Sequence, residues 1–121
     1  MTTNLTALKH NSKKKIYAVQ QLEIFNKLNE ITGISSENNN ILRYDIEDKK
    51  EEILKLKDDV KKFFSASKWA FFQYEEINKE NAILLMKSIY KEAGYKIFSK
   101  NITIERNGKK FLNRQYTLIK I

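Results

Sequence analysis

An Asn-Gly pair near the C-terminus, Asn107-Gly108, constrains the fold of this chain more than any other feature. Both residue types accept positive φ readily, so the pair favours the tight turn of a β-hairpin. Apolar residues alternate with polar ones on both sides of the pair, as in strands that bury one face. The alternating apolar residues are Ile102, Ile104, Tyr116 and Leu118. Residues 96–121 are therefore predicted to form a hairpin.

The register of this hairpin is open to two interpretations. A two-residue turn pairs Ile102 with Asn113, an apolar residue with a polar one. We therefore expect either a bulge near 112–114 or a longer loop over about 106–114, which brings Ile102 opposite Leu118. The longer loop produces an extended, basic and flexible tip.

The N-terminal third is predicted to be a polar, flexible tail over residues 1–12, followed by a helix over about 13–32. Gly33 suits the position after the end of this helix, because glycine adopts the left-handed conformation there. The tract at 35–40, SSENNN, reads as a linker. The apolar stripe of the helix comprises Ala18, Leu22, Phe25, Leu28 and Ile31.

The middle of the chain is predicted to hold a short strand over 41–46 and then a helix over about 46–64. In an extended segment, Leu42, Tyr44 and Ile46 share one face. Asp45 suits an N-cap, and acids at the start of the helix with lysines at its end match the helix dipole. The core stripe of this helix comprises Ile53, Leu56, Val60 and Phe63.

Two further helices are expected before the hairpin. Ser65-Ala66-Ser67 interrupts the preceding helix, and residues 68–76 follow it as an aromatic segment. Asn78 is a candidate N-cap for a helix over about 79–93, and Gly94 stands at its C-terminal stop. The stripe of this last helix comprises Ala82, Leu85, Met86, Ile89 and Ala93.

These elements add up to an α+β fold, a helical bundle of three to four helices followed by a C-terminal β-hairpin. A length of 121 residues suits one modest core. We expect a flexible tail at 1–12, an N-terminal helical extension at 13–34 and a domain spanning 41–121.

Positive charge is concentrated in the predicted hairpin. The chain has a formal net charge of +8, and residues 96–121 carry seven Lys and Arg against the single acid Glu105. Lys, Asn and Ile supply 47 of the 121 residues, a bias typical of AT-rich genomes, including those of some large DNA viruses. Because such a bias raises lysine by itself, the uneven placement of charge is more informative than its total. A basic hairpin after helices indicates contact with a polyanion, most simply nucleic acid.

In element order, residues 41–121 resemble the winged-helix class of helix-turn-helix domains. The resemblance implies DNA binding, with 68–76 as the positioning helix, 79–93 as the recognition helix and the hairpin tip at 106–114 as the wing. The chain departs from that class in the length of its helix at 46–64 and in its N-terminal helix, which has no fixed counterpart. Either of these helices could serve dimerisation instead.

The expected function is non-enzymatic binding of nucleic acid, DNA in preference to RNA, mainly through phosphate contacts. Lysine dominates over arginine and is a point charge without a bidentate fork, which favours backbone contacts over base reading. Salt should weaken such binding. The candidate contacts are Lys79, Lys87 and Lys91, expected on one side of the 79–93 helix; Lys100, Arg106, Asn107, Lys109, Lys110 and Arg114 of the hairpin; and Lys13, Lys14 and Lys15.

Each of these groups also has a plain structural interpretation. Lysines in the hairpin keep an edge strand soluble, and those on the helix belong to a solvated face. Asn81 and Asn107 could read adenine edges but also fit cap and turn positions. The aromatic cluster of Trp69, Phe71, Phe72 and Tyr74 could stack on bases, although helical spacing favours a place in the core.

Several function classes are disfavoured by composition. The chain has no Cys, which excludes disulfides and Cys-ligated metals, and its one His, His10, stands in a polar tail without an orienting partner. No phosphate-loop or nucleophile motif occurs, so we expect no enzyme, no cofactor and no metal site. The absence of an apolar run of about 18 residues and of a secretory signal predicts an intracellular protein of cytoplasm or nucleus, without membrane contact.

A second function class stays open. The helices at 13–32 and 46–64 could form a homodimer bundle, and the hairpin could add to the sheet of a partner. The protein would then be an interaction or assembly subunit, reasonable for a virus.

Overall fold

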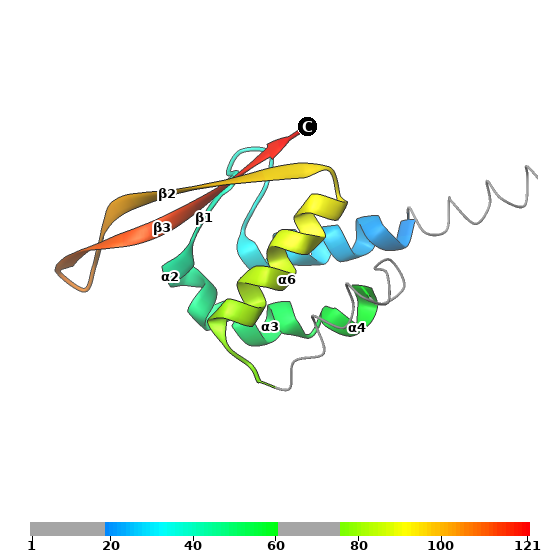
Figure 1. Cartoon of the computed structure of the whole chain (residues 1–121), viewed down its shortest axis with the longest axis horizontal. Helices are drawn as coiled ribbons and strands as arrows, with labels where there is room; N and C mark the ends of the chain where they lie inside the picture. Colours follow the sequence, from blue (N-terminus) through cyan, green and yellow to red (C-terminus); the bar gives the residue numbers. More distant parts are fainter. Residues whose placement is uncertain (1–18, 61–75) are drawn as a thin grey trace, which may run out of the picture.

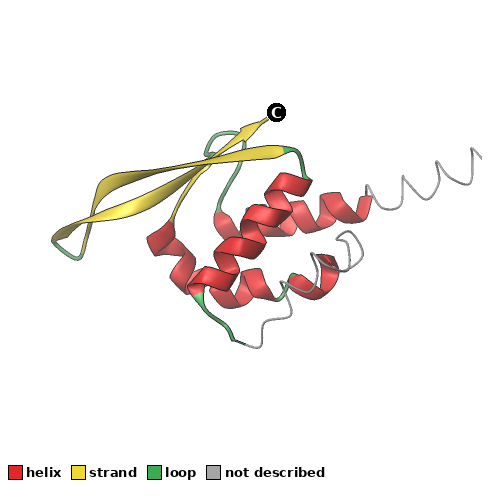
Figure 2. Cartoon of the chain, in the orientation of Figure 1, coloured by secondary structure: helices red, strands yellow, loops and turns green. Residues whose placement is uncertain are grey.

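The computed structural model describes residues 19–60 and 76–121. It shows an α+β fold in which a helical body is followed by a long C-terminal hairpin that projects away from the helices (Figure 1). The first described element is a helix over 19–32, and after it come one short strand, a series of helices and two long strands (Figure 2). In chain order they are β1 (Asn40–Leu42), α2 (Arg43–Ile46), the 3₁₀ helix η1 (Glu47–Lys49), α3 (Lys50–Leu54), α4 (Lys57–Val60), α6 (Lys79–Glu92), β2 (Tyr95–Arg106) and β3 (Lys109–Lys120).

The helix α6 forms as its sequence predicts. Asn78 caps it, because the Asn78 side-chain oxygen accepts a hydrogen bond from the backbone N–H of Asn81 at 2.8 Å. Gly94 follows its end with φ +91°. Of the predicted stripe, Ala82, Leu85, Met86 and Ile89 are buried, whereas Ala93 is the C-cap and is only partly buried.

The helix over 19–32 belongs to the same core as α6. It ends before Gly33, as predicted, and Gly33 has φ +78°. Leu28 is fully buried, but Leu22, predicted for the stripe, is 56% exposed and Ile24 takes the core position. A hydroxyl pair locks this helix to α6, because Tyr90 Oη lies 2.8 Å from Thr32 Oγ1. The predicted stripe residue Ala18 lies outside the described residues.

The prediction of a strand over 41–46 is wrong beyond Leu42. β1 covers Asn40–Leu42 and pairs only with residues 115–117 of β3. The chain then turns into α2, where the backbone N–H of Tyr44 donates to the Asn113 side chain at 3.0 Å instead of to a strand ladder. Asp45 therefore lies within α2 and is not an N-cap.

The single helix predicted over 46–64 is instead divided: Ile46 ends α2, η1 follows as a 3₁₀ helix, and the chain breaks again between α3 and α4. A tightened turn joins them, in which the N–H of Leu56 donates to Ile53 O at 3.0 Å. In a straight helix, residues two apart lie on different sides, so Leu54 and Leu56 could not both face the core. Because both are buried here, the helix breaks between them. Ile53, Leu56 and Val60 lie in the core as predicted. Phe63, Ser65-Ala66-Ser67 and the aromatic segment lie outside the described residues.

The hairpin has the tight two-residue turn, and both the bulge and the longer loop are wrong. Asn107 and Gly108 have φ of 56° and 75°, and strand pairing runs without interruption from Arg106↔Lys109 to Tyr95↔Lys120. Ile102 does pair with Asn113. This pairing is tolerated because the Asn113 side chain is used elsewhere, as the acceptor for Tyr44 described above.

The three strands form an antiparallel sheet in the order β1-β3-β2. One face, which we call the Tyr116 face, presents the buried Tyr116 and Leu118 to the helices. The opposite face, which we call the Phe98 face, carries Phe98, which is exposed, and nearer the turn Ile104 and Phe111, where this face packs on α2 and Ile104 is buried. α2 lies beneath the middle of the hairpin, where the Tyr44 and Phe111 rings meet at 5.4 Å.

Candidate nucleic-acid interface

Strand alternation divides the hairpin cations between the two faces of the sheet. Lys110 and Arg114 share the Tyr116 face, because they stand an even number of residues from Tyr116. Lys100, Arg106 and Lys109 lie on the Phe98 face by the same rule. The basic tip expected from the sequence is therefore not one patch.

A separate group of cations converges from three elements onto the Tyr116 side. Lys87 of α6 is half-buried, with its Nζ 4.9 Å from the centroid of the Tyr116 ring. Burial lowers the pKa of Lys87, and the positive charges of Lys91, Arg114 and Arg43 lower it further. The geometry agrees, because Arg43 and Arg114 line one hollow and Lys91 stands one helical turn after Lys87. We call Arg43, Lys87, Lys91 and Arg114 the basic surface.

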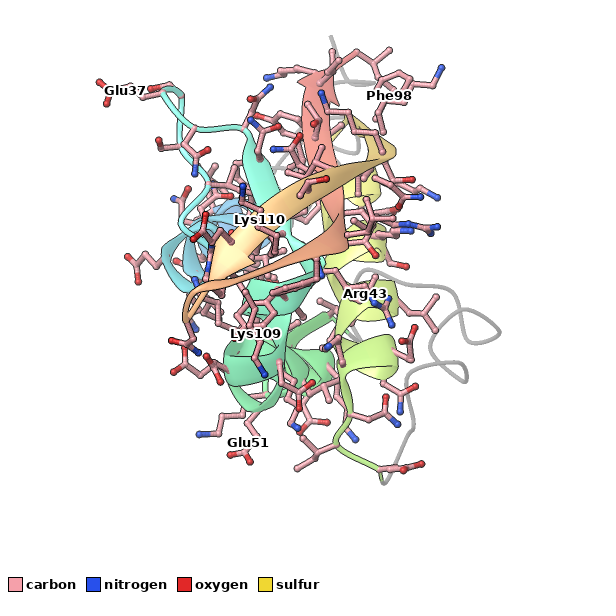
Figure 3. The ribbon with its side chains drawn as sticks, turned by 90° about the vertical axis from the view of Figure 1, so that its left-hand side faces the viewer. Glu37, Arg43, Glu51, Phe98, Lys109 and Lys110 are labelled. Carbon is pink, nitrogen blue, oxygen red and sulfur yellow. The ribbon has the colours of Figure 1, made fainter. Side chains whose placement is uncertain are left out.

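The basic surface adjoins an open polar hollow beside the hairpin. Arg43 of α2 reaches this hollow from below the sheet, and Figure 3 shows it to one side of the strands, viewed along the hairpin. Lys110 also lies on the Tyr116 face of β3, nearer the hairpin turn. The residues that line the hollow are Arg43, Asn101, Leu112, Asn113 and Arg114.

Most of the basic surface is not neutralised by acids. Arg43 forms an ion pair with Glu80 at the start of α6. Among the described residues, no carboxylate oxygen lies within 4.0 Å of the side-chain nitrogens of Lys87, Lys91 or Arg114. These three cations keep their charge available to an external anion.

Two other candidate cations are engaged elsewhere. Lys79 is paired with an acid, because its Nζ lies 3.5 Å from Glu47 Oε2 in η1. Arg106 has one guanidinium nitrogen 3.7 Å from Asp45 Oδ2 and packs over the Tyr44 ring. Both form intramolecular ion pairs at the surface.

The remaining candidates fall into turn positions or outside the structure. Asn107 occupies the hairpin turn, and the Asn81 side chain donates to the carbonyl of Glu76 at 3.0 Å, so both have structural roles. Lys13, Lys14, Lys15 and His10 lie outside the described residues, as does nearly all of the segment at 68–76.

Sequence reasoning missed Arg43 as a member of the surface. It stood in a segment read as a strand, and its position depends on where β1 ends and α2 begins. No local signal marks that point, because α2 has Leu42 as an N-cap without a side-chain hydrogen bond. Only the pairing of β1 with β3 places Arg43 near Arg114.

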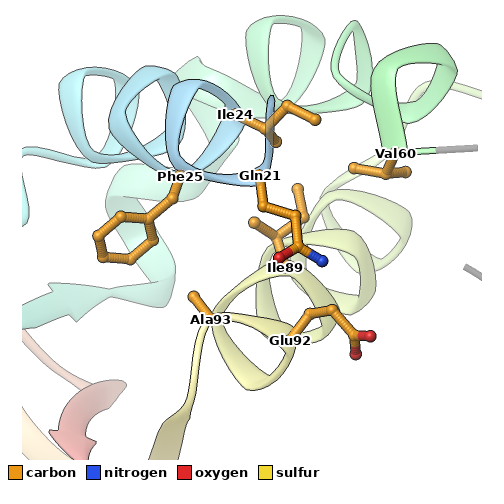
Figure 4. A pocket seen from close by; sticks show the side chains of 7 residues that line it. All are labelled: Gln21, Ile24, Phe25, Val60, Ile89, Glu92 and Ala93. Atoms are coloured by element: carbon orange, nitrogen blue, oxygen red, sulfur yellow. The ribbon is translucent and has the colours of Figure 1, made fainter. Parts of the chain in front are cut away.

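An apolar hollow between the helix over 19–32, α4 and α6 is too small for a ligand (Figure 4). It holds about 30 Å³, well below the about 300–1,000 Å³ of typical small-molecule sites. Its lining residues are Gln21, Ile24, Phe25, Val60, Ile89, Glu92 and Ala93.

Two other site classes find no support within the described ranges. No group of three or more His, Asp or Glu side chains there is placed to hold a metal ion. Among the helices of those ranges, none combines the length and the apolar character needed to cross a bilayer.

The apolar stripes expected to form a homodimer are used within the chain. Leu28 from the 13–32 stripe and Ile53 from the 46–64 stripe are both fully buried in the core. Val19 and Leu22 are each 56% exposed and are the apolar residues of the described helix over 19–32 that face solvent. The dimer stays a prediction.

Comparison with known proteins adds no family to this geometry: no family model matches the chain, and no curated protein or solved structure matches it significantly.

Proposed function

We propose that this protein binds nucleic acid, DNA in preference to RNA, without catalysing a reaction, and that phosphates lie against the basic surface. The observation that carries the proposal is the convergence of Lys87, Lys91 and Arg114 from α6 and β3, with no carboxylate oxygen of residues 19–60 and 76–121 within 4.0 Å of their side-chain nitrogens. Burial is the main cause of the lowered pKa of Lys87, and repulsion from Lys91, Arg114 and Arg43 lowers it further. A bound polyanion relieves that repulsion.

The arrangement also supports the winged-helix resemblance as a working hypothesis. The short strand β1 pairs with β3, and the β2–β3 hairpin projects from the body beside α6. In this proposal α6 acts as the recognition helix and the hairpin as the wing. Lys87 and Lys91 of α6 then contact the same duplex as Arg114 and Lys110 of the hairpin.

Phosphate contact by these side chains predicts modest sequence preference and steep salt dependence. Two of the four members of the basic surface are lysines, and Arg43 is already engaged with Glu80. Each neutralised phosphate contributes a slope of about −0.9 in log K against log salt on duplex DNA. Binding should therefore be seen at low salt and be lost well before 1 M.

Two neighbouring lysines supply a matched test. Lys109 and Lys110 stand next to each other on β3 and carry the same charge, but they lie on opposite faces of the sheet. We expect Lys110→Glu to weaken binding of a labelled 20-base-pair duplex, measured by fluorescence anisotropy at low salt, more than Lys109→Glu does. Arg114→Glu should weaken it further still, across unrelated duplex sequences.

DNA binding by the wild-type protein tests the proposed function as a whole. If it does not bind duplex or single-stranded DNA at low salt, the proposed function is wrong. If it binds but Lys109→Glu and Lys110→Glu have equal effects, the basic surface is not the site. Circular dichroism of each variant checks that the fold is retained.

A further inference from the structure

We propose that the Phe98 face of the sheet binds single-stranded nucleic acid, with one base stacked on Phe98 and the neighbouring phosphates at Lys96 and Lys100. The inference rests on the proposed function for the class of ligand, but it concerns a different face of the molecule and an unpaired strand. It stands on residues that take no part in the basic surface.

The first observation is a cation–aromatic–cation row on β2. Lys96, Phe98 and Lys100 occupy every second position of the strand, so their side chains lie on one face at spacings of about 7 Å. The Phe98 ring is 47% exposed, and Lys96 Nζ lies 5.5 Å from its centroid. A ring of this size left open to water between two cations is a suitable platform for a base and its phosphates.

The second observation is the chemistry of the surrounding face. The residues of β3 opposite the row are Ile119, Thr117 and Gln115. Ile119 is 49% exposed and widens the apolar platform beside Phe98. The Thr117 hydroxyl donates to Asn40 Oδ1 at 2.7 Å, which continues the polar part of this face onto β1.

The third observation is that no acid of the described residues pairs with the two lysines of the row; Asp45, which pairs with Arg106 on this face, lies toward the turn. The only acid in residues 96–121 is Glu105, and by strand alternation it belongs to the Tyr116 face. No carboxylate oxygen of the described residues lies within 4.0 Å of the Lys96 or Lys100 ammonium groups. The row is thus complementary in charge to an anionic ligand, and the exposed Phe98 ring adds a surface on which a base can stack.

An unpaired strand fits this face better than a duplex does. In a duplex the bases are stacked on one another and cannot lie on a protein ring, whereas a single strand offers its base faces. Stacking on an aromatic ring is tolerant of sequence, because every base has a π-face. The expected ligand is therefore a short single strand of any sequence.

The test compares single-stranded and duplex probes on one set of variants. A labelled dT₁₂ oligonucleotide and the 20-base-pair duplex are titrated with wild type, Phe98→Ala, Phe98→Tyr and Leu22→Ala. We expect Phe98→Ala to bind dT₁₂ roughly 10-fold more weakly, within the range found when stacking rings are removed, and to bind the duplex unchanged. Phe98→Tyr keeps a ring and should retain affinity. Leu22→Ala removes another exposed apolar side chain and controls for general surface effects.

The outcomes separate this inference from the proposed function. Duplex binding by wild type without dT₁₂ binding, or equal dT₁₂ affinity of wild type and Phe98→Ala, overturns the inference and leaves the basic surface in place. Loss of dT₁₂ binding in Leu22→Ala as large as in Phe98→Ala also overturns it. Binding of neither probe by wild type overturns both. A loss confined to Phe98→Ala and to dT₁₂ supports the stacking site.

Discussion

The ammonium group of Lys87 lies 4.9 Å from the centroid of the Tyr116 ring. This contact joins the exposed side of α6 to the central strand of the sheet. It holds a cation at a half-buried position, where the ring face offsets part of the cost of losing water. Lys87 is thereby kept close to Arg114, which stands two residues from Tyr116 on the same strand face.

Replacing Lys87 by methionine should weaken DNA binding without destabilising the fold. The variant keeps an apolar stem against Tyr116 but removes one charge from the basic surface. The slope of log K against log salt for duplex binding should become shallower by about one unit. Salt titration by fluorescence anisotropy measures this slope, and an unchanged slope would show that Lys87 contacts no phosphate.

The same variant has an expected effect on stability that depends on pH. Since the folded-state pKa of Lys87 is lowered by burial and repulsion, its charged form is disfavoured in the folded protein. That cost is present below the folded-state pKa and disappears as pH rises through the ordinary lysine pKa of about 10.4. At neutral pH, Lys87→Met should therefore unfold at equal or higher urea concentration than wild type.

Removal of the Tyr90 hydroxyl should destabilise the contact between α6 and the helix over 19–32. Tyr90 Oη lies 2.8 Å from Thr32 Oγ1 and 3.0 Å from Asn29 Oδ1, and Thr32 Oγ1 itself donates to Leu28 O. Tyr90→Phe leaves buried polar groups with fewer partners and should lower the free energy of unfolding by about 1–2 kcal/mol. Urea denaturation measures the change. Tyr44→Phe at an exposed ring is the control and should cost less.

Tyr90 should also make stability fall in alkaline solution. Burial raises the pKa of Tyr90 well above its ordinary value, although the Thr32 hydroxyl partly opposes this. The unfolded chain ionises this tyrosine near pH 10 while the folded chain does not, so stability is complete below about pH 10 and is lost as pH rises further. Urea midpoints between pH 8 and 11 should fall more steeply for wild type than for Tyr90→Phe.

Substitution of the turn glycine should weaken the hairpin. Gly108 has φ +75°, which an alanine adopts at a cost of about 1–2 kcal/mol, although no atom would meet the added Cβ. Gly108→Ala should lower the thermal midpoint, and Gly108→Asn should lower it less, because asparagine tolerates this conformation better. Equal midpoints for wild type and Gly108→Ala would show that the turn is not a two-residue turn in solution.

Local sequence signals were sufficient wherever one residue type is required by backbone geometry. Asn78 and Gly94 marked both ends of α6, and Asn107-Gly108 marked the turn, because caps and positive-φ positions admit few residues. The stripe of α6 followed from its 3.6-residue period. The cation–aromatic–cation spacing at 96–100 was also present in the predicted hairpin, but only the structure shows that Phe98 is exposed.

Signals that depend on a distant partner were misread. The Ile102–Asn113 pairing looked unfavourable because the use of Asn113 by Tyr44, 69 residues away in the chain, has no local trace. The break after Leu54 was missed because the apolar spacing of Ile53, Leu56 and Val60 also suits a straight helix. The break occurs because core packing buries both Leu54 and Leu56.

The sequence alone determined that a basic hairpin follows a helical body, since turn chemistry, periodicity and charge are properties of neighbouring residues. Which cations act together was decided only by the tertiary structure. A strand sends successive side chains to opposite faces, so strand register assigns Lys110 to one surface and Lys109 to the other. Packing of α2 and α6 against the sheet then brings Arg43 and Lys87 beside Arg114, although their positions in the chain are far apart.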